Sequence, residues 1–328
     1  MQAFIHPRRS LSCLLLVTLL LPAWLGAQDE RPERSSRFDH DILVETFGYE
    51  LGTPSDVPYE DIMQGCPARD CIPPIDDPVF VSAAEAEHVR DSDLVMGVVI
   101  KGDARAYPQL IMNHHEIVND TIGGQPVAVT YCPLCGSGVA FERELMGQPV
   151  EFGVSGLLHG NDLIMYDRHS NSLWQQITGT AFMGPMRGRE LTMVPMAMVE
   201  WQTWREAHPD TRVLSTETGH ARDYQRGAYG DYETSDRIMF PLANENLSVH
   251  PKTVVHGFEI AGQSLAVTDK RIERGAAEAT LGELRLRLEK TASGLVTATD
   301  VDSGKRWEGI RLFWFAWYNF HPGSELVK

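Results

Sequence analysis

Val127-Ala-Val-Thr-Tyr-Cys-Pro-Leu-Cys-Gly-Ser-Gly138 is the stretch around which the rest of the chain is organised. Its first five residues are mostly β-branched or aromatic, which predicts a strand running directly into Cys132 and Cys135. Gly136 and Gly138 then allow the backbone to turn tightly. Two cysteines at this spacing can chelate a metal, cycle as a dithiol or close a small disulfide, and the residues leave all three open.

The segments on either side of this stretch are also short and strand-like. Leu94–Val99 and Val139–Arg143 read as strands, and turns such as Lys101-Gly-Asp103 join strands into hairpins. Helical composition is confined to short segments, Gln109–Ile117 and Met196–Ala207. These features predict an α+β fold that is dominated by β structure, a mixed fold of hairpins and meanders with a few short helices.

Two distant hairpins resemble each other in sequence. Residues 94–106 match residues 254–266, with Gly97 opposite Gly257 and Gly102 opposite Gly262. The match predicts a degenerate internal repeat, and chance similarity between two hairpins is the alternative. The second copy lacks cysteines, so the chemistry of a repeat would belong to the first.

The first 27 residues have the features of a secretory signal. Arg8 and Arg9 precede an apolar core, Leu11–Leu21, and Leu25-Gly-Ala27 offers small residues for cleavage. We therefore expect a signal peptide over residues 1–27, an N-terminal leader over 28–60 and a single globular domain over 61–328. An uncleaved anchor helix is the alternative. Cleavage would leave a periplasmic or secreted protein with no membrane segment.

The chain is acidic, with a formal net charge of −16. Such a surface repels phosphate backbones and anionic lipids, which argues against a nucleic-acid partner. We expect a small-molecule or metal ligand instead.

Several side chains could complete a metal site. Cys132 and Cys135 supply half of a tetrahedral shell, and His114, His115 and Glu116 precede the strand that delivers them. Sulfur with imidazole suits zinc or copper. A helix cap or a core hydrogen bond is the alternative role for the two histidines. Cys66 and Cys71 could instead add two more sulfurs, which would make a closed structural site.

Proton carriers are expected from the segment that follows. Ser155–Asp162 reads as a polar, glycine-bearing loop that carries His159 and Asp162, and Asp167 ends the next strand. His159, Asp162 and Asp167 are candidate catalytic residues, with turn hydrogen bonds as the alternative role of the carboxylates. The residues after Cys135 predict a turn and a strand, whereas a thioredoxin-like dithiol needs a helix there.

A set of motifs gives the chain a family resemblance. They are His115-Glu-Ile-Val-Asn-Asp120, Tyr131-Cys-Pro-Leu-Cys-Gly-Ser137, Phe152-Gly-Val-Ser-Gly156, Met165-Tyr-Asp167 and Ser172-Leu-Trp-Gln-Gln176. Together they resemble the bacterial family catalogued as domain of unknown function 3179, over about residues 74–322. The resemblance implies an exported protein with one domain and brings no established reaction.

Three functions follow from these patterns. The first is an exported metal- or thiol-dependent enzyme that uses the Cys-x-x-Cys pair. The second is a non-catalytic periplasmic protein that binds a metal or a small ligand. The third is a structural module with two local disulfides, Cys66–Cys71 and Cys132–Cys135.

Overall fold

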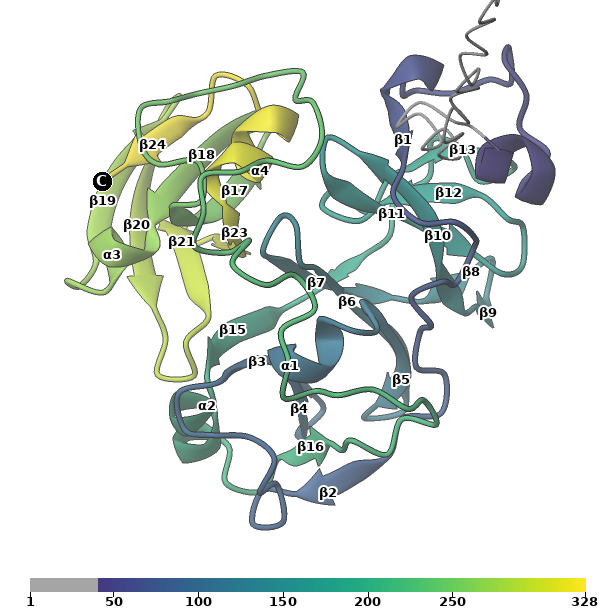
Figure 1. The fold of residues 1–328 in the computed structure, drawn as a ribbon. Helices are drawn as coiled ribbons and strands as arrows, with labels where there is room; N and C mark the ends of the chain where they lie inside the picture. The colour runs from purple at the N-terminus through teal and green to yellow at the C-terminus, as the bar shows by residue number, and fades with distance from the viewer. Residues whose placement is uncertain (1–40) are drawn as a thin grey trace, which may run out of the picture. The chain divides into compact units, whose positions relative to one another are not determined.

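The computed structural model describes residues 41–328, so the predicted signal peptide and residues 28–40 of the predicted leader lie outside the described residues. Strands dominate, which confirms the β-rich fold class, and every helix is short (Figure 1). The helical elements are η1 Ile42–Thr46, η2 Tyr59–Asp61, α1 Gln109–Met112, α2 Trp201–Ala207, α3 Asp269–Ile272 and α4 Trp314–Phe320. The strands up to the middle of the chain are β1 Ile62–Gln64, β2 Phe80–Ser82, β3 Leu94–Ile100, β4 Asp103–Pro108, β5 Ile117–Ile122, β6 Gln125–Cys132, β7 Ser137–Glu142, β8 Glu144–Leu145, β9 Gln148–Pro149, β10 Phe152–His159, β11 Asp162–Asp167 and β12 Leu173–Gln175. The remaining strands are β13 Ala181–Met183, β14 Met193–Val194, β15 Met196–Glu200, β16 Arg212–Leu214, β17 Val254–Ile260, β18 Gln263–Thr268, β19 Ala277–Leu281, β20 Leu284–Lys290, β21 Val296–Asp300, β22 Arg306–Glu308, β23 Ile310–Phe313 and β24 Glu325–Val327.

The first module comprises β3–β7 and β14–β16 with α1 and α2. One of its sheets has the order β15-β3-β4-β16, extended by β2, and the other has the order β14-β7-β6-β5. The predicted strand before Cys132 is β6, and the hairpin predicted around the turn Lys101-Gly-Asp103 is β3–β4.

The second module, β17–β24 with α3 and α4, follows the same plan. Its sheets have the orders β23-β17-β18-β24 and β22-β21-β20-β19, which match those of the first module strand by strand. The strand directions also agree. The fourth strand is parallel to its neighbour in both modules, β16 to β4 in the first and β24 to β18 in the second. In the view of Figure 1 the first module lies below the second.

The register of the two modules is the same. Ala197 pairs with Gly97 in the first module, and Ile310 pairs with Gly257 in the second. Each of these glycines lies under a buried tryptophan, Trp204 or Trp317, where an added Cβ would overlap the six-membered ring. Glycine is therefore needed for close packing at both positions.

The helix that carries each tryptophan ends in the same way. Trp204 packs on His208, and its indole nitrogen donates to Thr211 Oγ1 at 3.0 Å. Trp317 packs on His321 and donates to Ser324 Oγ at 2.7 Å. The aromatic residues 312–320 lie in β23 and α4 and are largely inaccessible to solvent.

A third sheet is inserted into the first module between β7 and β14. Its order is β1-β10-β11-β12-β13, and residues 42–57 of the predicted leader contribute Ile42, Leu43 and Phe47 to the core beside it. The prediction of a loop over Ser155–Asp162 is wrong, because β10 extends to His159 and only Gly160 and Asn161 form the turn. The glycine at 156 marks a bulge in the strand, where the register shifts, and not a loop.

The helix predicted over Met196–Ala207 begins only at Trp201. Met196–Glu200 instead forms β15, which pairs along its whole length with β3. Edge pairing and burial of Ala197, Met198 and Val199 outweigh the helical propensity of this segment.

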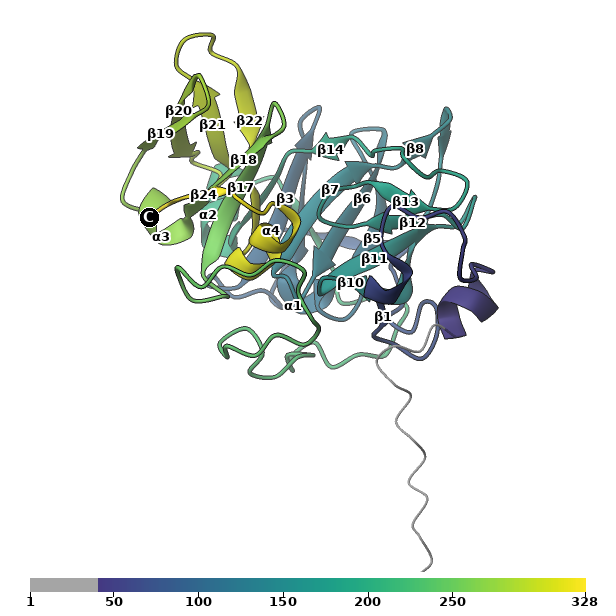
Figure 2. The same cartoon turned by 90° about the horizontal axis from the view of Figure 1, so that it is seen from above.

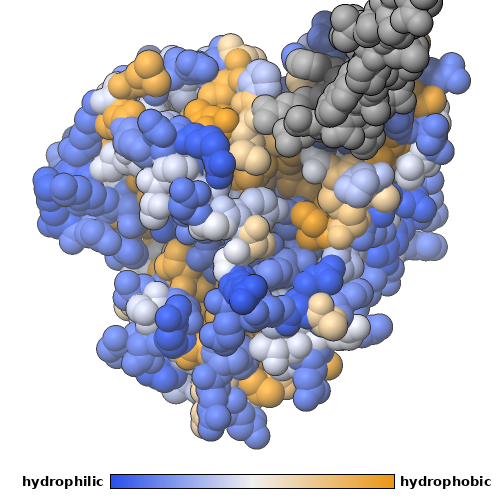
Figure 3. Space-filling model, in the orientation of Figure 1, coloured by the Kyte–Doolittle hydropathy of each residue, from blue (hydrophilic) through white to orange (hydrophobic). Residues whose placement is uncertain are grey.

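Residues 217–250 form a long connection without strands or helices that joins the two modules. Figures 1 and 2 both show this green segment running past α1. The face drawn in Figure 3 is largely hydrophilic, with apolar residues in separate patches. Among residues 41–328, no helix has the length and apolar character needed to cross a bilayer.

Candidate metal centre

Cys132, Cys135 and Asp162 meet in the interior. Their sulfur and carboxylate ligand atoms all lie within 4.8 Å of one another, and all three side chains are buried. Cys132 is the last residue of β6, Cys135 lies in the turn after it, and Asp162 opens β11. The Cys132 Sγ also lies 3.5 Å from the carbonyl oxygen of Asn161.

The turn that carries the cysteines is fixed by the second module. Gly136 has a positive φ of 59° and lies against the ring of Phe313, so a side chain there would be strained and would collide with the ring. The Phe313 N–H donates to the Cys135 carbonyl at 2.9 Å. Strand β23 therefore holds the cysteine turn in place.

Asp162 is held through one of its two oxygens. Oδ2 accepts hydrogen bonds from Gln175 Nε2 at 2.5 Å and from the Ile177 N–H at 2.9 Å. Among residues 41–328, no N–H or O–H group donates to Oδ1 although it is buried, and the Cys132 and Cys135 thiols are the neighbouring groups. A buried carboxylate oxygen without a partner is unfavourable, so a cation beside the sulfurs would satisfy it.

Burial sets the protonation of the cluster. It raises the pKa of the Asp162 carboxyl to about 7 and raises the pKa of the Cys132 and Cys135 thiols above their ordinary value. A bound cation reverses this tendency, because thiolate and carboxylate ligands lose their protons when a metal binds.

A cavity of about 130 Å³ adjoins the cluster, and Cys132 belongs to both. Its walls are mainly apolar and come from the insert sheet, the cysteine turn and the connection between the modules. The lining residues are Gly65, Cys66, Ile72, Glu116, Cys132, Leu134, Val154, Gly156, Leu157, Leu158, Leu163, Tyr229, Met239 and Phe240.

Glu116 is the only acidic residue in this lining. It is 5% exposed, has a positive φ of 59°, and accepts a hydrogen bond from the Tyr229 hydroxyl at 3.0 Å. Burial, with a smaller contribution from the charge of Asp162, raises its pKa to about 8. A non-glycine residue in this strained conformation is typical of functional sites.

The predicted histidine ligands lie elsewhere. His115 is buried, and its two ring nitrogens lie 2.7 Å from the Pro73 carbonyl and 2.7 Å from the Tyr224 hydroxyl. His114 Nε2 lies 3.0 Å from the Arg226 carbonyl. Neither histidine belongs to the cluster. Its third member is Asp162, which was predicted as a proton carrier and not as a metal ligand.

The other two predicted proton carriers have different surroundings. His159 Nδ1 lies 2.8 Å from Gln175 Oε1, so this glutamine joins His159 to Asp162. Asp167 accepts hydrogen bonds from Trp174 Nε1 at 2.9 Å and from Ser170, which makes it the anchor of a turn.

The cysteines divide into two pairs of different state. Cys66 and Cys71 form the predicted disulfide, whereas Cys132 and Cys135 are free thiols, so the second disulfide of the structural alternative is not formed. Cys66 and Cys71 do not join the described cluster to make a site with four sulfurs, because its third member is Asp162. The Cys66 side chain instead lines the cavity.

Residues of the connection between the modules were not singled out from the sequence. Tyr229 bonds to Glu116, and Phe240 exchanges two 2.8 Å hydrogen bonds with the side chain of Asn161. The only sequence signal was the tyrosine content of a long loop, which does not say where the loop lies.

The fold and this centre define a β-rich protein with a buried two-sulfur, one-carboxylate cluster at the end of a small apolar cavity. Residues 69–324 match the model of the family described as protein of unknown function (DUF3179), and the chain belongs to that family. This confirms the resemblance found in the motifs. Searches of curated proteins and of solved structures found no match.

Proposed function

We propose that this protein is a metal-dependent enzyme in which Cys132, Cys135 and Asp162 bind one zinc ion. Structural zinc sites use four protein ligands, whereas catalytic sites use three and leave a position for water or substrate. The cluster has three members, and the cavity lies beside Cys132, where a fourth ligand could enter. The observation that carries the proposal is the buried Asp162 Oδ1, to which no N–H or O–H group of residues 41–328 donates, in a cluster with two free thiols.

The donor set suits zinc better than other ions. Thiolates favour soft metals such as Cu(I) and Zn²⁺, and a carboxylate favours harder ions, so the mixed set matches a borderline ion. When bound, zinc would supply a Lewis acid at the inner end of the cavity. The chain would position the ion through the hydrogen bonds of Gln175 and Ile177 to Asp162, and Glu116 could hold or move a proton in the cavity.

Elemental analysis of the purified protein tests the proposal. We expect about one zinc per chain. Cys132→Ser and Asp162→Asn should each lower the zinc content at least tenfold, whereas Ser293→Ala, in the corresponding turn of the second module, should leave it unchanged. A chain that contains no metal and takes up neither Zn²⁺, Co²⁺ nor Cu⁺ in titrations would exclude a metal centre.

A dithiol function is the second candidate, and the position of the disulfide favours it. Cys66, bonded to Cys71, lines the same cavity as the free thiol Cys132. In an internal exchange the Cys132 thiolate would attack Cys66 and release Cys71 as a thiol. Cys135 would then displace Cys66, so that one disulfide is reduced as the other forms. A Cys132–Cys66 disulfide together with a free Cys71 thiol in a Cys135→Ser variant, seen by mass spectrometry after thiol alkylation and peptide digestion, would favour this function over the metal centre.

We further propose that the protein is exported after cleavage before Gln28, which the residue pattern of positions 1–27 supports. The mass of the mature chain and its recovery from the periplasm or medium test this. A cytoplasmic chain that retains Met1 would contradict it.

We also propose that the two modules are copies of one ancestral unit. Their equal strand order, direction and register support this, together with the match between residues 94–106 and 254–266. Unrelated modules would not be expected to share a glycine under a tryptophan at the same register position.

A further inference from the structure

The cavity beside the proposed zinc site limits the ligand by its size. Its volume is about 130 Å³. An apolar cavity of about 150 Å³ holds one benzene molecule. A ligand of about four to six non-hydrogen atoms would therefore fill the space beside Cys132.

The walls also limit the chemistry of the ligand. Val154, Leu157 and Leu163 present buried aliphatic side chains from β10 and β11, and Leu134 adds another from the cysteine turn. Such walls cannot solvate a charged group, so an ionised ligand would lose its hydration without replacement. The body of the ligand is therefore expected to be apolar and uncharged.

One polar group breaks this lining near the sulfurs. The Glu116 carboxyl uses Oε1 to accept from Tyr229, and Glu116 and Cys132 line the same cavity. A polar group of the ligand would find its hydrogen-bond partner there and its metal at Cys132. The polar end of the ligand thus points inward, and its apolar body fills the rest of the cavity.

Tyr229 and Phe240, which belong to the connection between the modules, line the cavity and are held by hydrogen bonds. Phe240 is held by both polar atoms of the Asn161 side chain, and Tyr229 is held by Glu116. Asn161 and Glu116 both have positive φ, of 70° and 59°. Hydrogen bonds to two constrained backbone positions restrain this side of the lining, which favours ligands that fit the existing space.

From these observations we infer that the centre takes a small uncharged molecule with an apolar body of about four to six non-hydrogen atoms and one neutral metal-binding group, the latter lying between the metal and Glu116. This inference rests on the proposed metal function and names the substrate class of that site.

Cobalt-substituted protein offers the test, because Co²⁺ in a sulfur-containing tetrahedral site has visible absorption that changes when a fourth ligand binds. The probe is pyrazole, a neutral five-atom ring with one metal-binding edge. We expect pyrazole to shift the cobalt bands and 3,5-di-tert-butylpyrazole to bind at least tenfold more weakly. The charged imidazole-4-acetate should also bind at least tenfold more weakly than pyrazole.

Two variants at one wall residue sharpen the test. Leu158→Phe should weaken pyrazole binding at least tenfold while the cobalt bands of the free protein persist. Leu158→Ala should tighten binding of the bulky pyrazole, a gain that a merely unstable variant would not produce. Leu247→Phe, at an 81% exposed position, is the matched control and should change neither affinity.

The outcomes separate the two proposals. Absence of cobalt bands from the unmodified chain would overturn the metal function and this inference with it. Cobalt bands that pyrazole does not shift, or equal affinity for small and bulky pyrazoles, would overturn the inference alone.

Discussion

The two modules have the same scaffold, yet the hairpin turns at equivalent places differ. In the first module β6 and β7 are joined through Cys132-Pro-Leu-Cys-Gly136, which lies against Phe313 of the second module. In the second module β20 and β21 are joined through Thr291-Ala-Ser-Gly-Leu295, and Gly294 lies against Val199 of the first. Each turn thus packs on the other module. The second module forms its turn without cysteines, so this type of hairpin does not require them.

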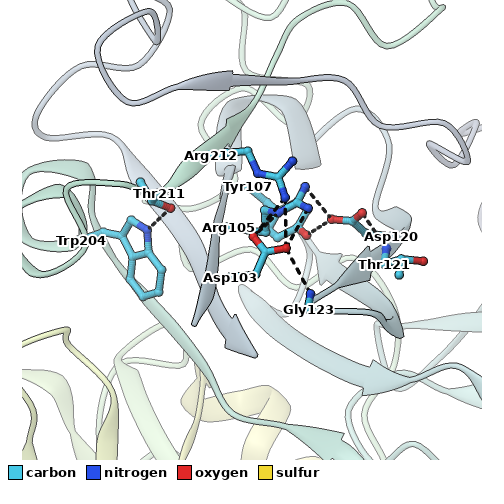
Figure 4. Close-up of polar contacts among 9 residues, drawn as sticks. All are labelled: Asp103, Arg105, Tyr107, Asp120, Thr121, Gly123, Trp204, Thr211 and Arg212. Carbon is cyan, nitrogen blue, oxygen red and sulfur yellow. Dashed lines mark hydrogen bonds and ion pairs between the residues drawn. The ribbon is translucent and has the colours of Figure 1, made fainter. Parts of the chain in front are cut away.

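The modules also differ in their buried charges. Figure 4 shows Arg105 of the first module between Asp103 and Asp120, with the Tyr107 hydroxyl donating to Asp120 at 2.5 Å. At the matching register positions the second module has Leu265 and Val267. The same sheet can therefore be built around an ionic network or around aliphatic side chains.

The largest expected difference concerns this network. Arg105→Leu should lower the free energy of unfolding by about 3 kcal/mol, because it removes the guanidinium beside the buried Asp120 and one of the two arginines that pair with Asp103. Leu265→Met at the equivalent position should lower it by less than about 1.5 kcal/mol. Urea denaturation of the two variants measures both values. Equal losses would show that the network contributes no more than aliphatic packing.

The glycine that packs against a buried tryptophan should contribute equally to the stability of both modules. We expect Gly97→Val and Gly257→Val each to destabilise by about 3 kcal/mol, because the new side chain overlaps Trp204 or Trp317. Thermal and urea unfolding provide the measurement. A variant that is tolerated in only one module would break the equivalence of the two packing sites.

Acidification should have a smaller effect on stability, and this effect arises in the second module. His256 donates to Asp269 at 2.8 Å, whereas the first module has Met96 and Gln109 at these positions. Burial alone would raise the pKa of Asp269, but the bond from His256 and the charges of His256, Arg311 and Lys290 lower it to about 2. A lowered carboxyl pKa stabilises the fold above the unfolded value, near 4, and that stability is lost as the pH falls towards 2.

The loss should amount to about 2 kcal/mol. Urea unfolding at several pH values between 4.5 and 2.5 should therefore show a steeper decline for the natural chain than for Asp269→Asn. Gln109→Asn, the matched change in the first module, should keep the steep decline. Parallel curves for all three proteins would rule out this linkage.

The smallest effect is expected at the indole hydrogen bonds. Thr211→Val and Ser324→Ala each remove the acceptor of a buried tryptophan N–H, which should lower stability by about 1 kcal/mol in either module. Double variants test independence, because the two sites share no partner and their effects should add. Strong non-additivity would show that the modules communicate through these helices.

Local features of the fold were predictable, and long-range partnerships were not. Hairpin β3–β4 followed from its β-branched residues and glycine turn, and the cysteine pair followed from its spacing. Asp162 was recognised as reactive but not as the neighbour of the sulfurs, because that contact depends on how the insert sheet packs. The hydrogen bonds that occupy His115, to Pro73 and Tyr224, likewise come from distant segments. In β15, sheet pairing overrode a helical composition.

The segment between the modules has a consequence for access to the cavity. Residues 217–250 join the two modules, and Tyr229 and Phe240 in this connection line the cavity beside Cys132. The first module without this connection would lack Tyr229, Met239 and Phe240 from the lining of the cavity. Cleavage of this connection should therefore widen the opening of the cavity even where every strand stays in place.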